Sequence, residues 1–343
     1  MPDARNRQIL FKSRPKGEPS QDNFLLVESA VPEPGEGHYL GRTIYLSLDP
    51  YMRGRMSDRK SYTEPAALGK VMIGATVSEV VASKNPKFSV GEIVLGYDGW
   101  QEYALSNGDG VRKLDPAQGA ISHALGVLGM PGLTAYSALL DVGKPKQGET
   151  VVVSAAAGAV GSVVGQIAKI HGCRAVGLAG TDEKCSFVRD ELGFDACINY
   201  KTRDLDAAFR ETCPDGIDVY YDNVAGKVLE AVLRHINLGA RIPLVGLISQ
   251  YNATEAPPGP NLAALLIKRA MIQGYLVFDH FHRTGEFLRE MSSWLREGKV
   301  KAVEHVVEGL ENAPRAFLGL FRGENLGKLI VKVGDDPTQA SAA

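Results

Sequence analysis

Apolar residues follow two different patterns along this chain. Up to about residue 120 they form short runs separated by glycine and proline, as in RTIYLSLDP, KVMIGATVSEVVAS and GEIVLGY. Short runs of this kind predict β-strands in a compact, barrel-like antiparallel domain. From about Pro145 onward, apolar runs alternate with segments whose apolar residues recur at helical spacing. This alternation predicts a doubly wound parallel sheet, so the fold class is α/β with an additional β-rich domain.

The second region can be divided into predicted elements. Strands are expected at residues 150–154, 174–178, 196–199, 217–222, 241–248 and 271–277. Helices are expected between them, among others at residues 161–171, 183–192, 227–235 and 262–268, with an amphipathic helix in FLREMSSWLREGKV. The last apolar run, GKLIVKV, fits poorly onto a filled six-strand sheet, so we expect it to return to the first domain. The predicted domains are therefore residues 1–125 with 310–343, and residues 126–309.

Composition and charge exclude several classes of protein. The 343 residues carry a net charge of −2, so no overall basic field favours nucleic acid or an anionic membrane as a partner. The uncharged stretch 116–140 is long enough to span a bilayer, but Pro131 and four glycines predict two short helices around GMPGLT instead. The N-terminal segment has charges where an export signal needs an apolar core, so we expect a cytoplasmic protein.

The metal-binding residue types are too widely scattered to predict a metal site. Cys173, Cys185, Cys197 and Cys213 form no CxxC pair, which argues against a structural zinc lobe and against a redox dithiol. We expect reduced, mostly buried thiols. The sequence DHFHR lacks a third histidine or a nearby cysteine, so no bound metal is expected.

The stretch ETVVVSAAAGAVGSVVGQIAKI predicts a strand, a glycine-rich turn and a helix. This is the context of a dinucleotide-binding fingerprint, here with Ala156, Gly158 and Gly161 in the three glycine positions. Gly158 allows the backbone to approach a pyrophosphate, and Gly161 allows the helix to pack closely on the strand. The helix N-terminus offers free N–H groups to the phosphates. The alternative is a glycine turn with a purely structural role.

The end of the second strand indicates which cofactor is bound. NAD sites place an acid there for the ribose 2′-hydroxyl, whereas this chain has Gly180 followed by Lys184. A lysine attracts a 2′-phosphate, so we favour NADP(H) over NAD(H), unless Lys184 is an ordinary surface lysine. Asp182 and Glu183 are expected in the first helical turn, where acids are favoured in any case.

Several further motifs identify a known family. AAAGAVGSVVGQIAK, GTDEK, INYKT, YYDNVAG, VGLISQYN, GENLGKLIVKV and LDPYMRGRM resemble those of one group of zinc-free medium-chain dehydrogenases/reductases. The group includes the prostaglandin reductases, the plant alkenal double-bond reductases and the bacterial curcumin reductases, and the resemblance runs over nearly the whole chain. It implies a GroES-like catalytic domain, a Rossmann domain, usually a homodimer, and NADPH-dependent reduction of the C=C bond of α,β-unsaturated ketones and aldehydes.

The resemblance also implies which residues hold the cofactor. The pyrophosphate would be bound by Gly158, Ala159, Val160 and Gly161, and the 2′-phosphate by Lys184 and Tyr200. The remaining contacts would come from Asn223, Val245, Gly246, Leu247, Ile248, Ser249, Tyr251, Tyr275, Leu276, Val277 and Asn325.

A reductase without a metal needs another group to stabilise the oxygen of its substrate. A neutral tyrosine can donate a hydrogen bond to that oxygen as negative charge develops on it. Tyr251 is the first candidate, because it follows the fifth predicted strand at the edge where open α/β sheets bind ligands. Tyr51 and Tyr62, in the first domain, are further candidates, and relatives have a similar set of three tyrosines. A quinone reductase of the same superfamily and a non-catalytic NADP(H)-binding sensor remain open as alternatives.

Overall fold

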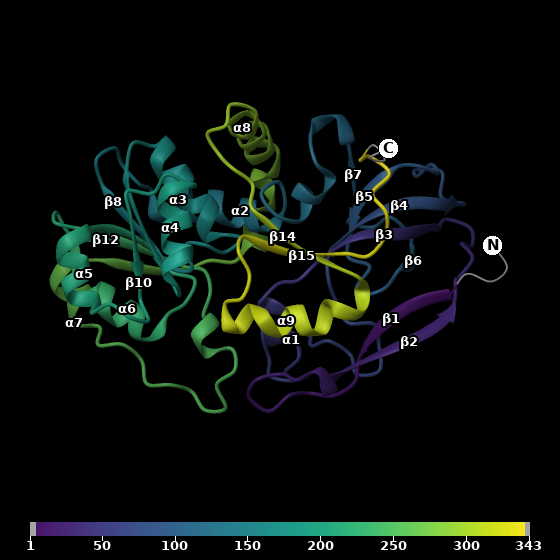
Figure 1. Cartoon of the computed structure of the whole chain (residues 1–343), viewed down its shortest axis with the longest axis horizontal. Helices are drawn as coiled ribbons and strands as arrows, with labels where there is room; N and C mark the ends of the chain where they lie inside the picture. The colour runs from purple at the N-terminus through teal and green to yellow at the C-terminus, as the bar shows by residue number, and fades with distance from the viewer. Residues whose placement is uncertain (1–4, 340–343) are drawn as a thin grey trace. The chain divides into compact units, whose positions relative to one another are not determined.

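The computed structural model describes residues 5–339, which divide into two compact units. The β-rich unit consists of the chain up to residue 125, residues 305–325 and the chain from residue 329 onward. The α/β unit consists of residues 126–304 and 326–328. The main segment of the α/β unit thus ends at residue 304, whereas the sequence led us to expect residue 309. Residues 326–328 also belong to this unit. In Figure 1 the colour runs along the chain, from purple at the N-terminus to yellow at the C-terminus, so the elements can be followed in chain order.

The β-rich unit contains a two-stranded hairpin and a larger, mixed sheet in which most pairings are antiparallel. The hairpin pairs β1 (Arg5–Phe11) with β2 (Phe24–Ala30). The larger sheet has the order β14-β15-β3-β4-β5-β7, with β6 also paired to β3. Its strands are β3 (Tyr39–Ser47), β4 (Thr76–Ser83), β5 (Ile93–Gly96), β6 (Tyr103–Ser106), β7 (Arg112–Leu114), β14 (Glu304–Glu308) and β15 (Lys328–Lys332). The run GKLIVKV forms β15 and pairs with β3, as its sequence predicts.

Short helices connect these strands. They are η1 (Gln21–Asn23), α1 (Tyr51–Arg55), η2 (Pro116–Gln118), η3 (Ile121–Leu125), η7 (Leu310–Asn312) and α9 (Ala313–Arg322). The apolar side of α9 packs into a core with the β1–β2 hairpin, where Phe24 stacks on Trp100 with ring centroids 5.2 Å apart.

The α/β unit is the predicted doubly wound sheet. Its strand order is β10-β9-β8-β11-β12-β13, which is the 3-2-1-4-5-6 order of a Rossmann fold, and its pairings are parallel. The strands are β8 (Thr150–Val153), β9 (Arg174–Ala179), β10 (Ala196–Asn199), β11 (Ile217–Tyr221), β12 (Ile236–Leu244) and β13 (Met271–Gly274). The helices are α2 (Met130–Ser137), η4 (Ala138–Gly143), α3 (Gly161–Ile170), α4 (Asp182–Asp190), α5 (Leu205–Thr212), α6 (Gly226–Leu233), η5 (Ile248–Gln250), α7 (Ala263–Lys268), η6 (Val277–Arg283) and α8 (Thr284–Arg296).

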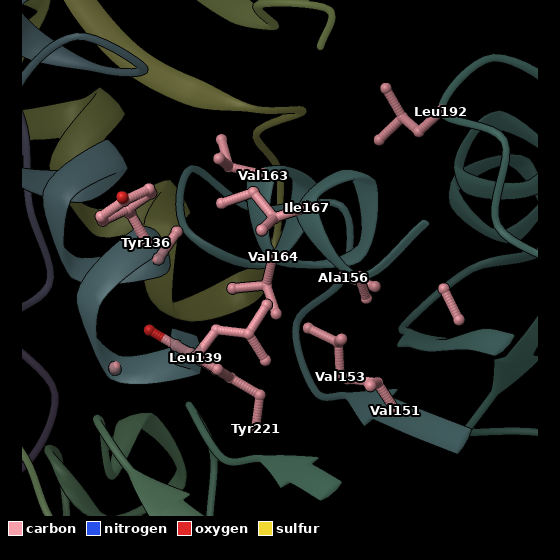
Figure 2. Close-up of a cluster of buried hydrophobic side chains, with 14 of the residues drawn as sticks. Tyr136, Leu139, Val151, Val153, Ala156, Val163, Val164, Ile167, Leu192 and Tyr221 are labelled. Atoms are coloured by element: carbon pink, nitrogen blue, oxygen red, sulfur yellow. The ribbon is translucent and has the colours of Figure 1, made fainter. Parts of the chain in front are cut away.

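Two apolar cores hold this sheet between its helices. One core joins α2, α3 and α8 to β8 and β11, and the other joins α5 and α6 to β9, β11 and β12. Figure 2 shows the first, where Val163, Val164 and Ile167 of α3 cluster with residues of β8. Each side chain of this size contributes roughly 1.5–3 kcal/mol when fully buried. This core fixes the start of α3 against the end of β8, which is where the glycine-rich turn lies.

Some predicted boundaries differ from the structure for identifiable reasons. The strand expected at 241–248 is β12, which begins earlier, at Ile236, and passes through an irregularity in its pairing with β11, where Gly239 has a left-handed φ of 74°. It ends at Leu244 because Val245 and Gly246 both donate to the carbonyl of Asp222. The strand expected at 271–277 ends at Gly274, where the chain turns towards η6.

The motif GMPGLT also differs from its expectation. It begins α2 rather than separating two helices, because a proline in the first helical turn needs no backbone donor.

Candidate functional site

The turn between β8 and α3 is very closely packed. A Cβ placed on Gly161 would lie 2.4 Å from the carbonyl oxygen of Ala155, so only glycine fits at the start of α3. Gly158 is more open, with the same oxygen 3.2 Å from its Cβ position. Ala155 itself has a left-handed φ of 50°, an uncommon conformation for alanine. The turn is therefore held in one strained shape before any ligand binds.

The backbone of this turn suits a phosphate group. In the part of the chain that the structure describes, the N–H groups of Ala159 and Val160 donate to no protein acceptor. They lie at the N-terminus of α3, whose dipole favours negative charge. The carbonyl oxygen of Ala157, in the same turn, is already bonded within the protein, because it accepts a 2.7 Å hydrogen bond from the N–H of Gly327. The residues predicted to contact the pyrophosphate thus lie in one turn of the backbone, between β8 and α3.

The ends of β8 and β11 meet at the point where the strand order reverses, which is the usual ligand position in open α/β sheets. Asn223 crosses this point, since its Nδ2 donates to the carbonyl of Ser154 over 2.8 Å and its backbone N–H donates to the Ser154 hydroxyl. Asp222, fully buried, accepts hydrogen bonds at Oδ1 from the N–H groups of Val224 and Ala225. Burial raises the pKa of Asp222 above its ordinary value. Asn223 thus lies at this edge of the sheet, and its amide nitrogen is already hydrogen-bonded to the carbonyl of Ser154.

The segment from Val245 to Tyr251 is fastened to this same edge. The Ser249 hydroxyl donates to the carbonyl of Val224 over 2.6 Å, and the N–H of Ile248 donates to that of Asn223. A Cβ on Gly246 would lie 3.0 Å from the Asn223 carbonyl oxygen, so the two loops are in close contact. Tyr251 directly follows η5 and is half-buried. It therefore lies on the loop that extends from the carboxyl end of β12.

Basic and polar groups gather at the end of β9. A Cβ on Gly180 would lie 3.3 Å from the Tyr200 hydroxyl and 3.5 Å from Nζ of Lys201. Burial lowers the pKa of Lys184, and the charge of Lys201 lowers it further, so the two ammonium groups are neighbours. Two lysines and a phenol around a glycine form a suitable site for a dianionic phosphate.

Sequence reasoning missed Lys201, which the structure brings to this site. Its only signal was its position next to Tyr200 in INYKT. Asp182, an acid close to the expected 2′-phosphate site, has a structural role. Asp182 accepts a 2.7 Å hydrogen bond from the amide of Asn199, which fixes its carboxylate against β10.

Tyr275 has a different environment from the one its motif suggests. Its side chain is buried, and its hydroxyl is 2.5 Å from that of Ser137 in α2. Burial raises its pKa to about 12. The ring also packs on His280 at 4.5 Å. Any contact of this segment with a cofactor would therefore come from its backbone or from Leu276, which is 38% exposed, rather than from the Tyr275 hydroxyl or from the buried Val277.

The candidate tyrosines of the β-rich unit form a group of their own. Tyr51 begins α1, and burial raises its pKa well above its ordinary value. The carboxylate of Asp49 and the hydroxyls of Tyr97 and Tyr62 raise this pKa further, so all three groups lie near Tyr51. Tyr62 is 54% exposed. Tyr97 was not predicted from the sequence and is a further candidate, since its side chain is 60% exposed beside the same group.

Asn325 lies in the β-rich unit as a wall of a cavity of about 400 Å³. This cavity is formed by β14, α9 and the loop that follows α9. Within residues 5–339, no group of three or more His, Cys, Asp or Glu side chains is placed to hold a metal ion. Over the same residues, no helix is both long enough and apolar enough to cross a bilayer.

Comparison with known proteins agrees with this geometry. A family model described as the N-terminal domain of oxidoreductase matches residues 7–114, and one described as zinc-binding dehydrogenase matches residues 159–293. The NADPH-dependent curcumin reductase of Escherichia coli is 52% identical over 97% of this chain and 98% of its own length. The 2-alkenal reductase (NADP(+)-dependent) of Nicotiana tabacum is 43% identical over 96% of this chain and 97% of its own.

Solved structures are similar over the same range. CurA from Vibrio vulnificus, in complex with NADPH, is 53% identical with a TM-score of 0.92, covering 96% of this chain and all of that one. Among relatives compared by sequence alone, prostaglandin reductase 1 of Rattus norvegicus is 43% identical over 94% of this chain and 97% of its own length. The sequence predicts a β-rich domain together with a Rossmann domain. These matches and the sheet order confirm that fold class.

Proposed function

This chain belongs to the zinc-free medium-chain dehydrogenases/reductases, in the group of the curcumin, 2-alkenal and prostaglandin reductases, and we propose that it reduces conjugated C=C bonds with NADPH. Its substrates are small α,β-unsaturated ketones and aldehydes. The observation that carries the proposal is Lys201 beside Gly180, with Lys184 close enough for the charge of Lys201 to lower its pKa, combined with a closely packed glycine turn at the switch point of the sheet. The first feature selects NADPH, and the second positions it.

The residues of the chain have separate tasks in this reaction. NADPH, when bound, supplies the hydride that is added to the β-carbon of the substrate. The N–H groups of Ala159 and Val160 would hold the pyrophosphate, and Lys184, Tyr200 and Lys201 would hold the 2′-phosphate. The segment from Val245 to Tyr251, which is hydrogen-bonded to Asn223 and Val224, would border the reacting end of the cofactor.

A tyrosine hydroxyl stabilises the substrate as its carbonyl becomes an enolate. Tyr251 is the proposed donor, with Tyr51 and Tyr62 as further candidates. For Tyr51, burial beside Asp49 disfavours the phenolate, so the proton stays on the hydroxyl and is available for donation. The reaction is completed when the α-carbon gains a proton.

An assay of NADPH consumption tests this function. Purified protein is given a panel of enones, enals, quinones and saturated ketones, and each product is identified. Saturation of the double bond with the carbonyl intact supports the proposal. If only quinones are reduced, the protein is a quinone reductase instead. If it binds NADPH but reduces none of the compounds, it is a non-catalytic NADPH sensor.

The proposal includes a homodimer formed through the edge of the Rossmann sheet. β13 is the outermost strand, and apolar side chains around it are unusually exposed, with Leu266 at 81%, Ile267 at 69% and Met271 at 40%. Exposed edge strands flanked by apolar side chains favour pairing with another chain. Light scattering after size exclusion tests this, since Ile267→Asp should convert a dimer to a monomer. The cytoplasmic location remains a prediction.

A further inference from the structure

The short helix η6 directly follows the segment that is predicted to lie near the nicotinamide, and few apolar contacts hold it in place. Its side chains are mostly exposed: Val277 is buried, whereas Phe278 and Phe281 are 44% and 46% exposed. A helix with so little apolar burial opens easily unless polar contacts hold it. The position of η6 therefore depends on its hydrogen bonds and ion pairs.

Asp141 in η4 provides these polar contacts. Its Oδ1 accepts a hydrogen bond from Nη1 of Arg283, and its Oδ2 accepts one from Nδ1 of His280 over 3.2 Å. Because a carboxylate can only accept, the imidazole carries a proton on Nδ1. His280 and Arg283 are three residues apart, so they lie on the same side of a 3-10 helix. One carboxylate thus holds one whole side of η6.

The element that carries Asp141 is itself firmly held. Arg241 of β12 donates from Nε to the carbonyl of Gly143 over 2.9 Å and from Nη2 to that of Lys144 over 2.8 Å. These bonds connect the end of η4 to the parallel sheet. Leu139, earlier in η4, is fully buried in the first apolar core. The carboxylate of Asp141 is therefore a fixed point, from which η6 is positioned.

Arg283 is also oriented by groups other than Asp141. Its Nε donates to Glu286 over 3.0 Å, and its Cζ lies 5.1 Å from the centre of the Tyr136 ring. The side chains of Arg283 and Asp141 are only 19% and 29% exposed. A partly buried ion pair whose arginine is held in one orientation loses less to solvent screening and side-chain entropy than a surface pair.

These contacts bear on the segment that precedes η6. The N–H of Tyr275 donates to the carbonyl of Leu244 over 3.0 Å, which fixes the start of this segment just beyond β13. Among residues 5–339, the N–H of Leu276 donates to no protein acceptor, so it is available to a ligand such as the carboxamide oxygen of a nicotinamide. The ring of His280 packs on that of Tyr275, with centroids 4.5 Å apart. A shift of η6 would therefore reach Leu276 directly.

We propose that Asp141 is a positioning residue for the reduction. Through its two contacts with η6 it holds Leu276 in the place where the nicotinamide of NADPH is bound at the angle required for hydride transfer. Asp141 itself touches neither the cofactor nor the substrate. The inference rests on the proposed function, because it assigns to Leu276 a contact with NADPH. Loss of Asp141 affects the nicotinamide end of the cofactor and leaves the adenosine end unchanged.

Two ligands separate the two ends of the cofactor in a calorimetric titration. NADPH carries both ends, whereas 2′,5′-ADP carries the adenosine and the 2′-phosphate but no nicotinamide. Asp141→Asn should raise the Kd of NADPH about 3- to 10-fold, as expected for one lost hydrogen bond, and leave the Kd of 2′,5′-ADP unchanged. It should also lower kcat with an enone about 10- to 100-fold, because a misplaced nicotinamide reacts slowly. Asp141→Glu, which keeps a carboxylate, should recover part of both losses.

The α/β unit contains a matched control for this substitution. Asp206 of α5 accepts hydrogen bonds from Arg234 over 2.8 Å and from His235 over 2.7 Å, which is the same combination of side chains between α5 and the end of α6. Asp206→Asn should leave kcat and both Kd values unchanged, even if it lowers the thermal midpoint. If Asp141→Asn weakens NADPH and 2′,5′-ADP equally, its role is purely structural and the proposal is overturned. Unchanged kcat and Kd values would overturn it as well.

Hydrogen exchange of the wild-type protein provides a test that does not depend on how a variant folds. NADPH should slow exchange in the peptide that contains Leu276, and 2′,5′-ADP should not. If bound NADPH leaves this exchange unchanged, the proposal is overturned, whereas double-bond reduction in the product assay would leave the proposed function intact. A wild-type protein that binds neither ligand would overturn the proposed function and this inference with it.

Discussion

Gly177 in β9 makes room for Ala156 in the turn after β8, since a Cβ on Gly177 would lie 2.8 Å from that of Ala156. A hydrogen bond from the N–H of Ala156 to the carbonyl of Leu178 holds the two segments at this spacing. The space between turn and strand accommodates one methyl group. In the common fingerprint a glycine stands in the turn, whereas here the glycine stands on the neighbouring strand. The turn therefore keeps its shape with alanine in the first position.

This relationship predicts a compensating pair of substitutions. Gly177→Ala should destabilise the protein by roughly 1–3 kcal/mol, because it puts two methyl groups where one fits. Adding Ala156→Gly should recover part of the loss, but not all, since Val188 and Cys197 also lie within 3.1 Å of the added atom. Denaturant unfolding followed by fluorescence measures both. Equal stability of the single and double variants would show that the Ala156 contact is unimportant.

A strained alanine predicts a stabilising substitution. Ala225, before α6, has φ 62° and ψ −154°, a region that is occupied almost only by glycine. Ala225→Gly should raise the free energy of unfolding by about 1 kcal/mol, because relief of the strain exceeds the added flexibility of glycine. The thermal midpoint should rise accordingly.

The control for this substitution is Ala207→Gly, in α5. In an ordinary helical position glycine lowers stability, by about 0.5–1 kcal/mol. The two variants should therefore shift the midpoint in opposite directions. A fall in both would mean that the conformation of Ala225 is not strained.

The sequence was sufficient for the fold because its patterns are local. Each strand of the Rossmann sheet is an apolar run, and the glycine-rich turn lies between a strand and a helix. The ends of β12 and β13 were less predictable, because they depend on distant groups such as the carbonyl of Asp222.

The candidate site was only partly predictable for a similar reason. Lys201 reaches Gly180 only because β10 pairs with β9. Tyr97 joins Tyr51 through the folding of the β-rich unit. The spacing of these residues along the chain predicts none of these contacts. The predicted cofactor and catalytic residues themselves remain predictions that await the substitutions below.

Replacement of the two lysines should change cofactor selection. Lys184→Ala and Lys201→Ala should each weaken NADPH binding by about 10- to 100-fold, because each removes a charge-assisted contact to the 2′-phosphate. NADH binding should change little, since NADH lacks that phosphate. Kd values for both cofactors, from fluorescence titration, check this. Lys169→Ala, which removes an ion pair with Asp195 elsewhere in the unit, serves as the control. Equal losses with NADPH and NADH would disprove a 2′-phosphate site.

The pH dependence of binding should depend on Lys184. Burial and Lys201 lower the pKa of Lys184 in the free protein, and a neighbouring phosphate dianion raises it in the complex. Binding therefore takes up a proton between the two values, and NADPH affinity falls as pH rises through the lower one. Titrations between pH 7 and 10 should show this slope for the wild type but not for Lys184→Ala. A slope of the same size with NADH would contradict the assignment.

Removal of one hydroxyl tests the proposed chemistry. Tyr251→Phe should lower kcat by roughly 10²- to 10³-fold, the usual effect of losing a donor to a developing oxyanion. The KM for NADPH should remain close to that of the wild type, because the phosphate contacts are unaffected. Tyr275→Phe is the matched control, since that hydroxyl is bonded to Ser137 in the interior and should affect stability more than turnover. Steady-state kinetics with an enone measure both variants. Unchanged turnover in Tyr251→Phe would transfer the donor role to Tyr51 or Tyr62, where the same substitution can be repeated.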